Sequence, residues 1–253
     1  MKMHVLSGGR LRMSRATYVP DATPDESIVI PVLSIVLKHP SGNVIFDTGC
    51  HPGAASDGDG RWAAMIDVVE PVFRKEDALV NQLSKTGLDA DDIDVVVCSH
   101  LHIDHCGCNA FFKKATVICH ARELEYATAD GAADRGYIRE DWELGPAPEI
   151  MEGERDLFGD GKLTLISAPG HTPGSIIAHA VLDHDGAFVL ASDAVPMRNC
   201  LDQRYAPMFS WSRDQTVRTM DEIARLESDG ATVIFGHDED QWLRLRKGEA
   251  FYA

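Results

Sequence analysis

The segment Ser99–His105, with the sequence SHLHIDH, decides the fold of this 253-residue chain. It directly follows Ile93–Cys98 (IDVVVC), a short apolar run that predicts a buried strand. His100 and His102 are two residues apart, so an extended backbone would send both imidazoles to the same side. Imidazole nitrogens and carboxylate oxygens, the latter supplied here by the aspartate of the segment, are ligands of zinc and related divalent metals. The segment therefore predicts a metal centre at the end of a buried strand.

Three later fragments have the same form, a potential ligand directly after a predicted strand. The first is a histidine in a loop that glycine and proline make tight, and the others are an aspartate and a histidine that follow apolar runs. One strand-end histidine is more often structural than functional, but together with the first segment these fragments complete a set of seven donors. The set is His100, His102, Asp104, His105, His171, Asp193 and His237.

Apolar, β-branched runs between turn residues predict strands along most of the chain. The predicted strands are Ser27–Lys38, Val44–Phe46, Ile93–Cys98, Thr116–Cys119, Lys162–Ala168, Ser175–Leu182, Ala187–Ala191 and Ala231–Phe235. Helical periodicity and capping residues predict helices at Glu76–Thr86, from about Ala121, and from a Ser212 cap to about Ser228. Pro31, inside the first strand, predicts a bulge or an edge position there. Two mixed sheets packed face to face, with helices outside, would bury these faces and give an α/β fold.

Composition limits the classes of function. The length and the 44% hydrophobic content suit one large domain or two fused halves, and we expect a single domain over residues 1–253. The net charge of −16 disfavours nucleic acid and membrane partners, because it repels phosphates and anionic lipids. No signal-peptide or membrane-spanning pattern is present, and the six cysteines are not spaced as a secreted framework. These features predict a cytoplasmic protein with free thiols.

On these residues the chain resembles the metallo-β-lactamase superfamily. The signature HxHxDH is matched by residues 100–105, and the later ligands match in order and identity. The resemblance extends from Phe46–Gly49 (FDTG) to His237, and it implies an αββα four-layer sandwich with metals at the loop ends of the sheets. It also implies a division of ligands, with one metal held by His100, His102 and His171. The second metal would be held by Asp104, His105 and His237, with Asp193 bridging, and Asp47 would orient a metal-binding histidine.

Within the superfamily the chain is most similar to the quorum-quenching N-acyl homoserine lactonases and the related 4-pyridoxolactonases. The motifs are Phe46–Pro52 (FDTGCHP), Ser99–Gly107 (SHLHIDHCG) and Phe235–Asp238 (FGHD). The similarity implies a small lactone or ester substrate, opened by a hydroxide held between two divalent metals. Zinc is the expected metal, and manganese, iron or cobalt suit the same donors. Asp104 would pass a proton to the leaving alkoxide.

Two positions depart from the lactonase pattern. A tyrosine that commonly lies three residues after the bridging aspartate, and helps to polarise the substrate carbonyl, is replaced by Pro196. Tyr205, further along the same segment, is the expected catalytic substitute. Cys108 stands where a glycine is more usual, and a packing role is expected for its thiol. Two segments, His51–Arg61 and Ala129–Pro148, fit no regular element and are expected to be irregular loops. Apolar side chains in or beside the irregular segments could form a wall for an acyl chain: Trp62, Met65, Tyr137, Trp142, Met208, Phe209 and Trp211.

Other activities stay open at this point. A 4-pyridoxolactonase or a thioesterase of the glyoxalase II kind would use the same donors. A mononuclear iron redox enzyme would not require all of Asp104, His105 and His237, and a metal-binding regulator would need no turnover. The sequence leaves the oligomeric state open between a monomer and a homodimer.

Overall fold

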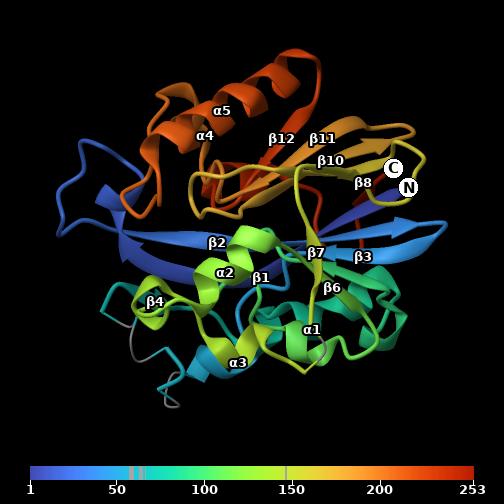
Figure 1. Ribbon diagram of the computed structural model, residues 1–253, viewed down its shortest axis with the longest axis horizontal. Coiled ribbons are helices and arrows are strands. Elements are labelled where there is room, and N and C mark those ends of the chain that lie inside the picture. Colours follow the sequence, from blue (N-terminus) through green and yellow to red (C-terminus); the bar gives the residue numbers. More distant parts are fainter. Residues whose placement is uncertain (57–59, 63–64, 66, 146) are drawn as a thin grey trace.

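The computed structural model describes residues 1–56, 60–62, 65, 67–145 and 147–253. Two β-sheets lie face to face, and helices cover their outer sides (Figure 1). The first sheet has the order β13-β1-β2-β3-β5-β6-β7, and β4 pairs with β1. Its strands are β1 (Lys2–Ser14), β2 (Ser27–His39), β3 (Gly42–Phe46), β4 (Val69–Pro71), β5 (Val95–Val97), β6 (Thr116–His120), β7 (Glu149–Met151) and β13 (Phe251–Tyr252).

The second sheet has the order β12-β11-β10-β9-β8. Its strands are β8 (Glu154–Asp156), β9 (Leu163–Ser167), β10 (Ile176–Leu182), β11 (Gly186–Ser192) and β12 (Thr232–Phe235). The α-helices are α1 (Leu79–Gln82), α2 (Ala121–Thr128), α3 (Arg139–Trp142), α4 (Arg198–Asp202), α5 (Arg213–Ser228) and α6 (Glu239–Arg244). Both sheets are mixed, because β3, β5, β6 and β7 run parallel, as do β11 and β12, among otherwise antiparallel neighbours. None of the described helices is long and apolar enough to span a bilayer.

The hydrophobic residues form layers that match this arrangement. Between the sheets, Phe46 of the first packs in one cluster with Leu165 of the second. On the outer face of the second sheet, Met220 and Ile223 of α5 are buried in a cluster with Val233. A third cluster joins the other face of the first sheet to the short helices α1, α2 and α3. The expected αββα sandwich is therefore confirmed.

One of the two longest strands of the first sheet, β1, was missed in the sequence. β1 pairs with β2 along its whole length, and the register shifts between Ser7 and Gly9. The adjacent glycines and scattered polar residues of this segment hide its alternation, and pairing with β2 supplies what local propensity lacks. The irregularity predicted from Pro31 is present. The register shift in β1 is a bulge, and it lies beside Pro31 on the partner strand. Pro31 itself pairs with Arg10 but lies beyond the part of β2 that pairs with β3.

The prediction of a single helix over Glu76–Thr86 was wrong. The segment divides into the 3-10 turn Lys75–Asp77, the short α1 and the 3-10 turn Leu83–Thr86. Ala78 is extended, with ψ of 144°, and the Asp77 carboxylate accepts a hydrogen bond from the Arg74 amide. The apolar spacing was still informative, because Leu79 and Leu83 are buried.

The two segments that we expected to be irregular contain short helices. Pro52–Ser56 is a 3-10 turn in the first segment, His51–Arg61, of which residues 57–59 lie outside the described residues. The second, Ala129–Pro148, holds the 3-10 turn Ala133–Arg135 and α3. Residue 146 in this second segment also lies outside the described part.

An ion pair between Arg61 and Asp141 ties these two segments together. Burial raises the pKa of Asp141 to about 6, although Arg61 opposes the shift. A carboxyl whose pKa is raised by folding stabilises the protein below its unfolded pKa, and this stability is lost as the pH rises through the folded pKa. Relative to Asp141→Asn, the wild type should therefore lose up to about 3 kcal/mol of unfolding free energy between about pH 4 and about pH 6.

Chemical denaturation of both proteins across this pH range measures the difference. Asp130→Asn, at an exposed carboxylate that does not contribute to the Asp141 shift, is the control and should show no such trend. If the wild type instead gains stability over the variant as the pH rises, pairing with Arg61 outweighs burial and the expectation is wrong.

Candidate metal centre

The seven predicted donors lie together where four strands end. His100, His102, Asp104 and His105 occupy the loop after β5, and His171 occupies the loop between β9 and β10. Asp193 directly follows β11, and His237 lies two residues beyond β12. Because β9, β11 and β12 run in the same direction, their carboxyl ends meet at one edge of the second sheet. That edge faces the loop from the first sheet and brings the two halves of the donor set together.

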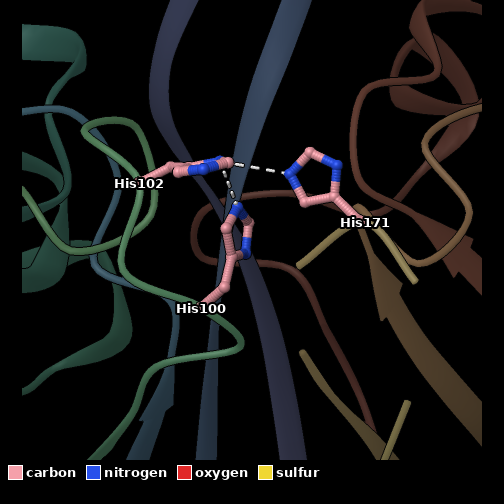
Figure 2. Close-up of side chains that lie close together, drawn as sticks. All are labelled: His100, His102 and His171. Atoms are coloured by element: carbon pink, nitrogen blue, oxygen red, sulfur yellow. Dashed lines mark hydrogen bonds between the residues drawn. The ribbon is translucent and has the colours of Figure 1, made fainter. Parts of the chain in front are cut away.

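Three imidazoles form the first group of donors (Figure 2). His102 Nδ1 lies 3.0 Å from His100 Nε2 and 3.1 Å from His171 Nε2. Burial and then His105 hold the pKa of His100 well below its ordinary value, and burial and then His171 lower that of His102 to about 3. Burial also lowers the pKa of His171. Three neutral imidazoles with converging nitrogens leave lone pairs available for a cation.

The second group contains Asp104, His105 and His237. His105 Nε2 lies 3.5 Å from Asp104 Oδ2, and His237 Nε2 lies 3.7 Å from the same oxygen. Burial alone would lower the pKa of His105, but Asp104, Asp193 and Asp47 outweigh it and raise this pKa well above its ordinary value. Asp193 likewise outweighs burial and raises the pKa of His237. Negative charge concentrated here would favour a cation in place of these protons.

Asp193 stands between the two groups. Its Oδ2 lies 3.4 Å from His171 Nε2, and its Oδ1 lies 2.9 Å from His237 Nε2 and 3.3 Å from His105 Nε2. Despite these short distances, Asp193 Oδ1 and His105 Nε2 are buried without a hydrogen-bond partner among the described residues. Buried polar atoms without a partner are costly, and a shared cation would satisfy both. The donor set therefore fits divalent metal ions, with Asp193 placed to contact two.

The outward nitrogens of these histidines are held by hydrogen bonds. His105 Nδ1 donates to Asp47 Oδ2 at 2.9 Å, and His237 Nδ1 donates to the Pro31 carbonyl at 2.9 Å. His100 Nδ1 lies 2.9 Å from Ser99 Oγ. Each contact fixes the ring so that Nε2 faces the centre, an arrangement typical of metal-binding histidines. The orienting contact expected of Asp47 is confirmed.

Glu123 is a buried residue of the site that sequence reasoning missed. This side chain of α2 accepts hydrogen bonds from the Leu101 amide at 3.0 Å, from Tyr137 Oη at 2.9 Å and from Thr172 Oγ1 at 2.5 Å. It thereby ties the loop of His100 and His102 to the loop of His171. A glutamate in an amphipathic helix carries no local signal of burial, because its partners come from three distant segments.

A cavity of about 230 Å³ opens beside the metal-binding groups. Its lining includes His102, Asp104, His171 and Asp193 together with the apolar side chains Leu11, Met13, Ile30, Val69, Phe209 and Trp211. A larger hollow of about 560 Å³, beside residues 127–133, touches none of the seven donors. The smaller cavity is therefore the candidate substrate site, because it combines four of the seven donors with an apolar wall.

The structure separates the residues that we expected to form this wall. Met65, Phe209 and Trp211 line the cavity. Trp62 and Trp142 are buried in the core, and Met208 is largely exposed. Tyr137 packs its ring edge-on against His102.

The position of Tyr205 gives no support to its predicted catalytic role. Its hydroxyl donates to the Ala16 carbonyl at 3.4 Å, and its ring packs against the hydrophobic core. Tyr205 does not contribute to the described lining of the cavity. Tyr18 does contribute, and its ring centroid lies 6.2 Å from that of His237. Burial, followed by Asp193 and Asp104, raises the pKa of Tyr18 well above its ordinary value.

The six cysteines are all free and buried, as expected. Cys108 Sγ donates to the Cys50 carbonyl at 3.2 Å, so this thiol has a packing and hydrogen-bonding role. Burial raises the pKa of Cys108 to about 12, which keeps it protonated.

Comparison with known proteins agrees with the fold. The chain is 34% identical over 259 residues to N-acyl homoserine lactonase AttM of Azorhizobium caulinodans, covering 100% of this chain and 98% of the relative. It is 33% identical to N-acyl homoserine lactonase AiiB of Agrobacterium fabrum, covering 99% of each chain.

Solved structures show the same fold. One is an N-acyl homoserine lactone hydrolase with the product N-hexanoyl-L-homoserine at its catalytic metal centre, with a TM-score of 0.88 at 23% identity, covering 99% of this chain and 98% of the other. A dizinc quorum-quenching lactonase, AidC, matches with a TM-score of 0.71 at 15% identity, covering 94% and 87%.

The family model of the metallo-beta-lactamase superfamily matches residues 28–237, a span that contains all seven donors. Together with the sandwich of two mixed sheets and the clustered histidines, this match shows that the chain belongs to the metallo-beta-lactamase superfamily.

Proposed function

We propose that this protein is a dinuclear metal-dependent lactonase that opens the ring of N-acyl homoserine lactones, as a quorum-quenching enzyme does. The observation that carries the proposal is the pair of donor groups that share Asp193 and face a cavity with an apolar wall. The relatives named N-acyl homoserine lactonase, which cover the whole chain, support this choice of substrate.

Each group of donors would hold one cation. His100, His102 and His171 would bind the first, and Asp104, His105 and His237 the second, with Asp193 shared by both. When bound, the two cations supply an activated water and polarise the substrate carbonyl. We propose zinc for both positions, because mixed imidazole and carboxylate donors suit it.

The protein side chains would then position the substrate and move a proton. Asp104 lies at the cavity, with 14% of its side chain exposed, so one carboxylate oxygen can reach a bound ligand. In this position it can carry a proton to the ring oxygen as that oxygen leaves as an alkoxide. Phe209 and Trp211, half-exposed at the same cavity, offer apolar surface to an acyl chain.

Further features of the chain follow from the same centre. We propose that residues 1–253 act as one domain, because loops from both sheets supply the donors. We also propose a cytoplasmic location, which the six free thiols support. Both a monomer and a homodimer are compatible with this site, because all seven donors come from one chain.

Elemental analysis combined with a substrate panel tests the proposed function. The panel contains acyl homoserine lactones of several chain lengths, 4-pyridoxolactone and a glutathione thioester. We expect two divalent ions per chain and hydrolysis of the acyl homoserine lactones, abolished by a chelator and restored by zinc. If the protein binds two ions but hydrolyses only another member of the panel, that compound replaces the proposed substrate. If it binds one iron per chain and consumes oxygen, the assignment as a hydrolase is wrong.

A further inference from the structure

The cavity contains a phenol to which the proposed reaction has assigned no role. Tyr18 is 6% exposed and lines the same cavity as Asp104 and Asp193. Its hydrogen bonds to described residues all use its backbone: the amide donates to the Arg15 carbonyl, and the carbonyl accepts from Asn199 and Cys200. The hydroxyl is therefore available to a ligand in the cavity.

The backbone of Tyr18 is held by the segment that follows Asp193. Asn199 Nδ2 donates to the Tyr18 carbonyl at 2.9 Å, and Tyr205 Oη donates to the Ala16 carbonyl at 3.4 Å. The Met208 amide donates to the Thr17 carbonyl, also at 3.4 Å. This segment carries Pro196 in place of a tyrosine, and it fixes the turn that presents Tyr18. A buried ring on a braced turn is pre-organised, so little freedom would be lost when its hydroxyl meets a ligand.

We propose that Tyr18 is a catalytic residue whose hydroxyl donates a hydrogen bond to the carbonyl oxygen of the bound lactone. The proposal rests on the proposed hydrolysis. As water oxygen bonds to the carbonyl carbon, the π electrons move to the carbonyl oxygen, and a donor aimed at that oxygen stabilises the growing charge. When the ring carbon–oxygen bond breaks, its electron pair leaves on the ring oxygen, which takes the proton that Asp104 received from the water. The electrons on the carbonyl oxygen then return to form the carbonyl of the carboxylic acid. Tyr18 keeps its proton throughout, as expected of a phenol whose ordinary pKa is about 10.

The position of Tyr18 also indicates which side of the substrate it would contact. Its ring neighbours His237, of the second donor group, whereas the first group lies across Asp193. The lactone carbonyl oxygen should therefore point toward the Asp104–His237 side of the centre. Tyr205, which was the candidate from sequence, would act only indirectly, because its hydroxyl holds Ala16 in the turn before Tyr18.

Tyr18→Phe tests the proposal, because it keeps the ring and removes only the hydroxyl. In the metal-loaded protein we expect kcat/KM for the acyl homoserine lactone to fall by about tenfold to a hundredfold, mainly through kcat. Bound metal per chain and melting temperature should match the wild type. Tyr252→Phe, in β13 and outside the described lining of the cavity, is the matched control and should leave the kinetics unchanged. Tyr205→Phe should lose less activity than Tyr18→Phe.

Two results would overturn this role. One is a Tyr18→Phe enzyme whose kcat/KM, expressed per bound metal, stays within twofold of the wild type. The other is a greater loss in Tyr205→Phe than in Tyr18→Phe. If the wild type hydrolyses a thioester of the panel and no lactone, the proposed substrate fails, and the same three variants then test Tyr18 on the thioester carbonyl.

Discussion

Replacing Asp193 with alanine is expected to remove both tightly bound metal and hydrolysis. This carboxylate contacts members of both groups, through His171 on one side and His105 and His237 on the other. Without it, neither group keeps its shared ligand, and His105 and His237 lose a carboxylate that raises their pKa values. Metal assistance contributes several kcal/mol to hydrolysis, so kcat/KM should fall by at least about a thousandfold.

Metal analysis after dialysis and steady-state kinetics measure these losses together. Asp193→Asn retains the size of the side chain and should show the same direction of change, which separates lost charge from a cavity. Asp202→Asn is the control, because Asp202 is an exposed residue of α4 on the same segment and should keep both metal and activity. An Asp193→Ala protein that keeps two ions per chain and full turnover would contradict the shared position of this carboxylate.

The donor set could be predicted from sequence because the residues next to each donor reveal its position. Each follows an apolar run, so the strand and the polar residue at its end are visible in a single short window. The loop of His171 carried a second signal in its glycines. Gly170 has φ of 152°, and a Cβ there would lie 2.5 Å from the backbone of Thr216, so this tight approach to α5 excludes a side chain. The fold followed from the same windows, because alternating strands and helices permit few layered arrangements.

The residues that sequence reasoning missed have partners far away in the chain. Tyr18 reaches the cavity because Asn199, 181 positions later, holds its carbonyl, and no local pattern records such a contact. Glu123 is buried for the same kind of reason, because the hydrogen bonds from Leu101, Tyr137 and Thr172 come from different segments. Lactonases commonly carry a tyrosine at the position of Pro196, and Tyr205, further along the same segment, was the predicted substitute. The structure instead offers a phenol from the N-terminal hairpin, which a search along the chain could not reveal.

Asp47→Asn should weaken metal binding at the second donor group, although Asp47 touches no metal position directly. Its Oδ1 accepts a hydrogen bond from the Ser99 amide at 2.7 Å, and its Oδ2 accepts from His105 Nδ1 at 2.9 Å. The hydroxyls of Ser99 and Ser192 also donate to Oδ2. All four partners donate, so an amide must turn its own NH₂ toward at least one donor. If the NH₂ meets His105, the ring must change tautomer and place a proton on Nε2, where the cation would bind.

The expected cost is a tenfold to hundredfold lower affinity for one of the two ions, with about 1–3 kcal/mol lost from the free energy of unfolding. Asparagine is the suitable replacement because Asp47 has φ of 62°, a conformation that asparagine tolerates and alanine does not. Competition with a chromophoric chelator measures the two affinities, and denaturation of the metal-free protein measures stability. Asp94→Asn is the matched control, because this exposed carboxylate also accepts a backbone hydrogen bond, from the Asn43 amide at 2.7 Å, but contacts no donor histidine. Unchanged affinity for both ions in Asp47→Asn would mean that His105 keeps its orientation without this carboxylate, and that packing alone holds the ring.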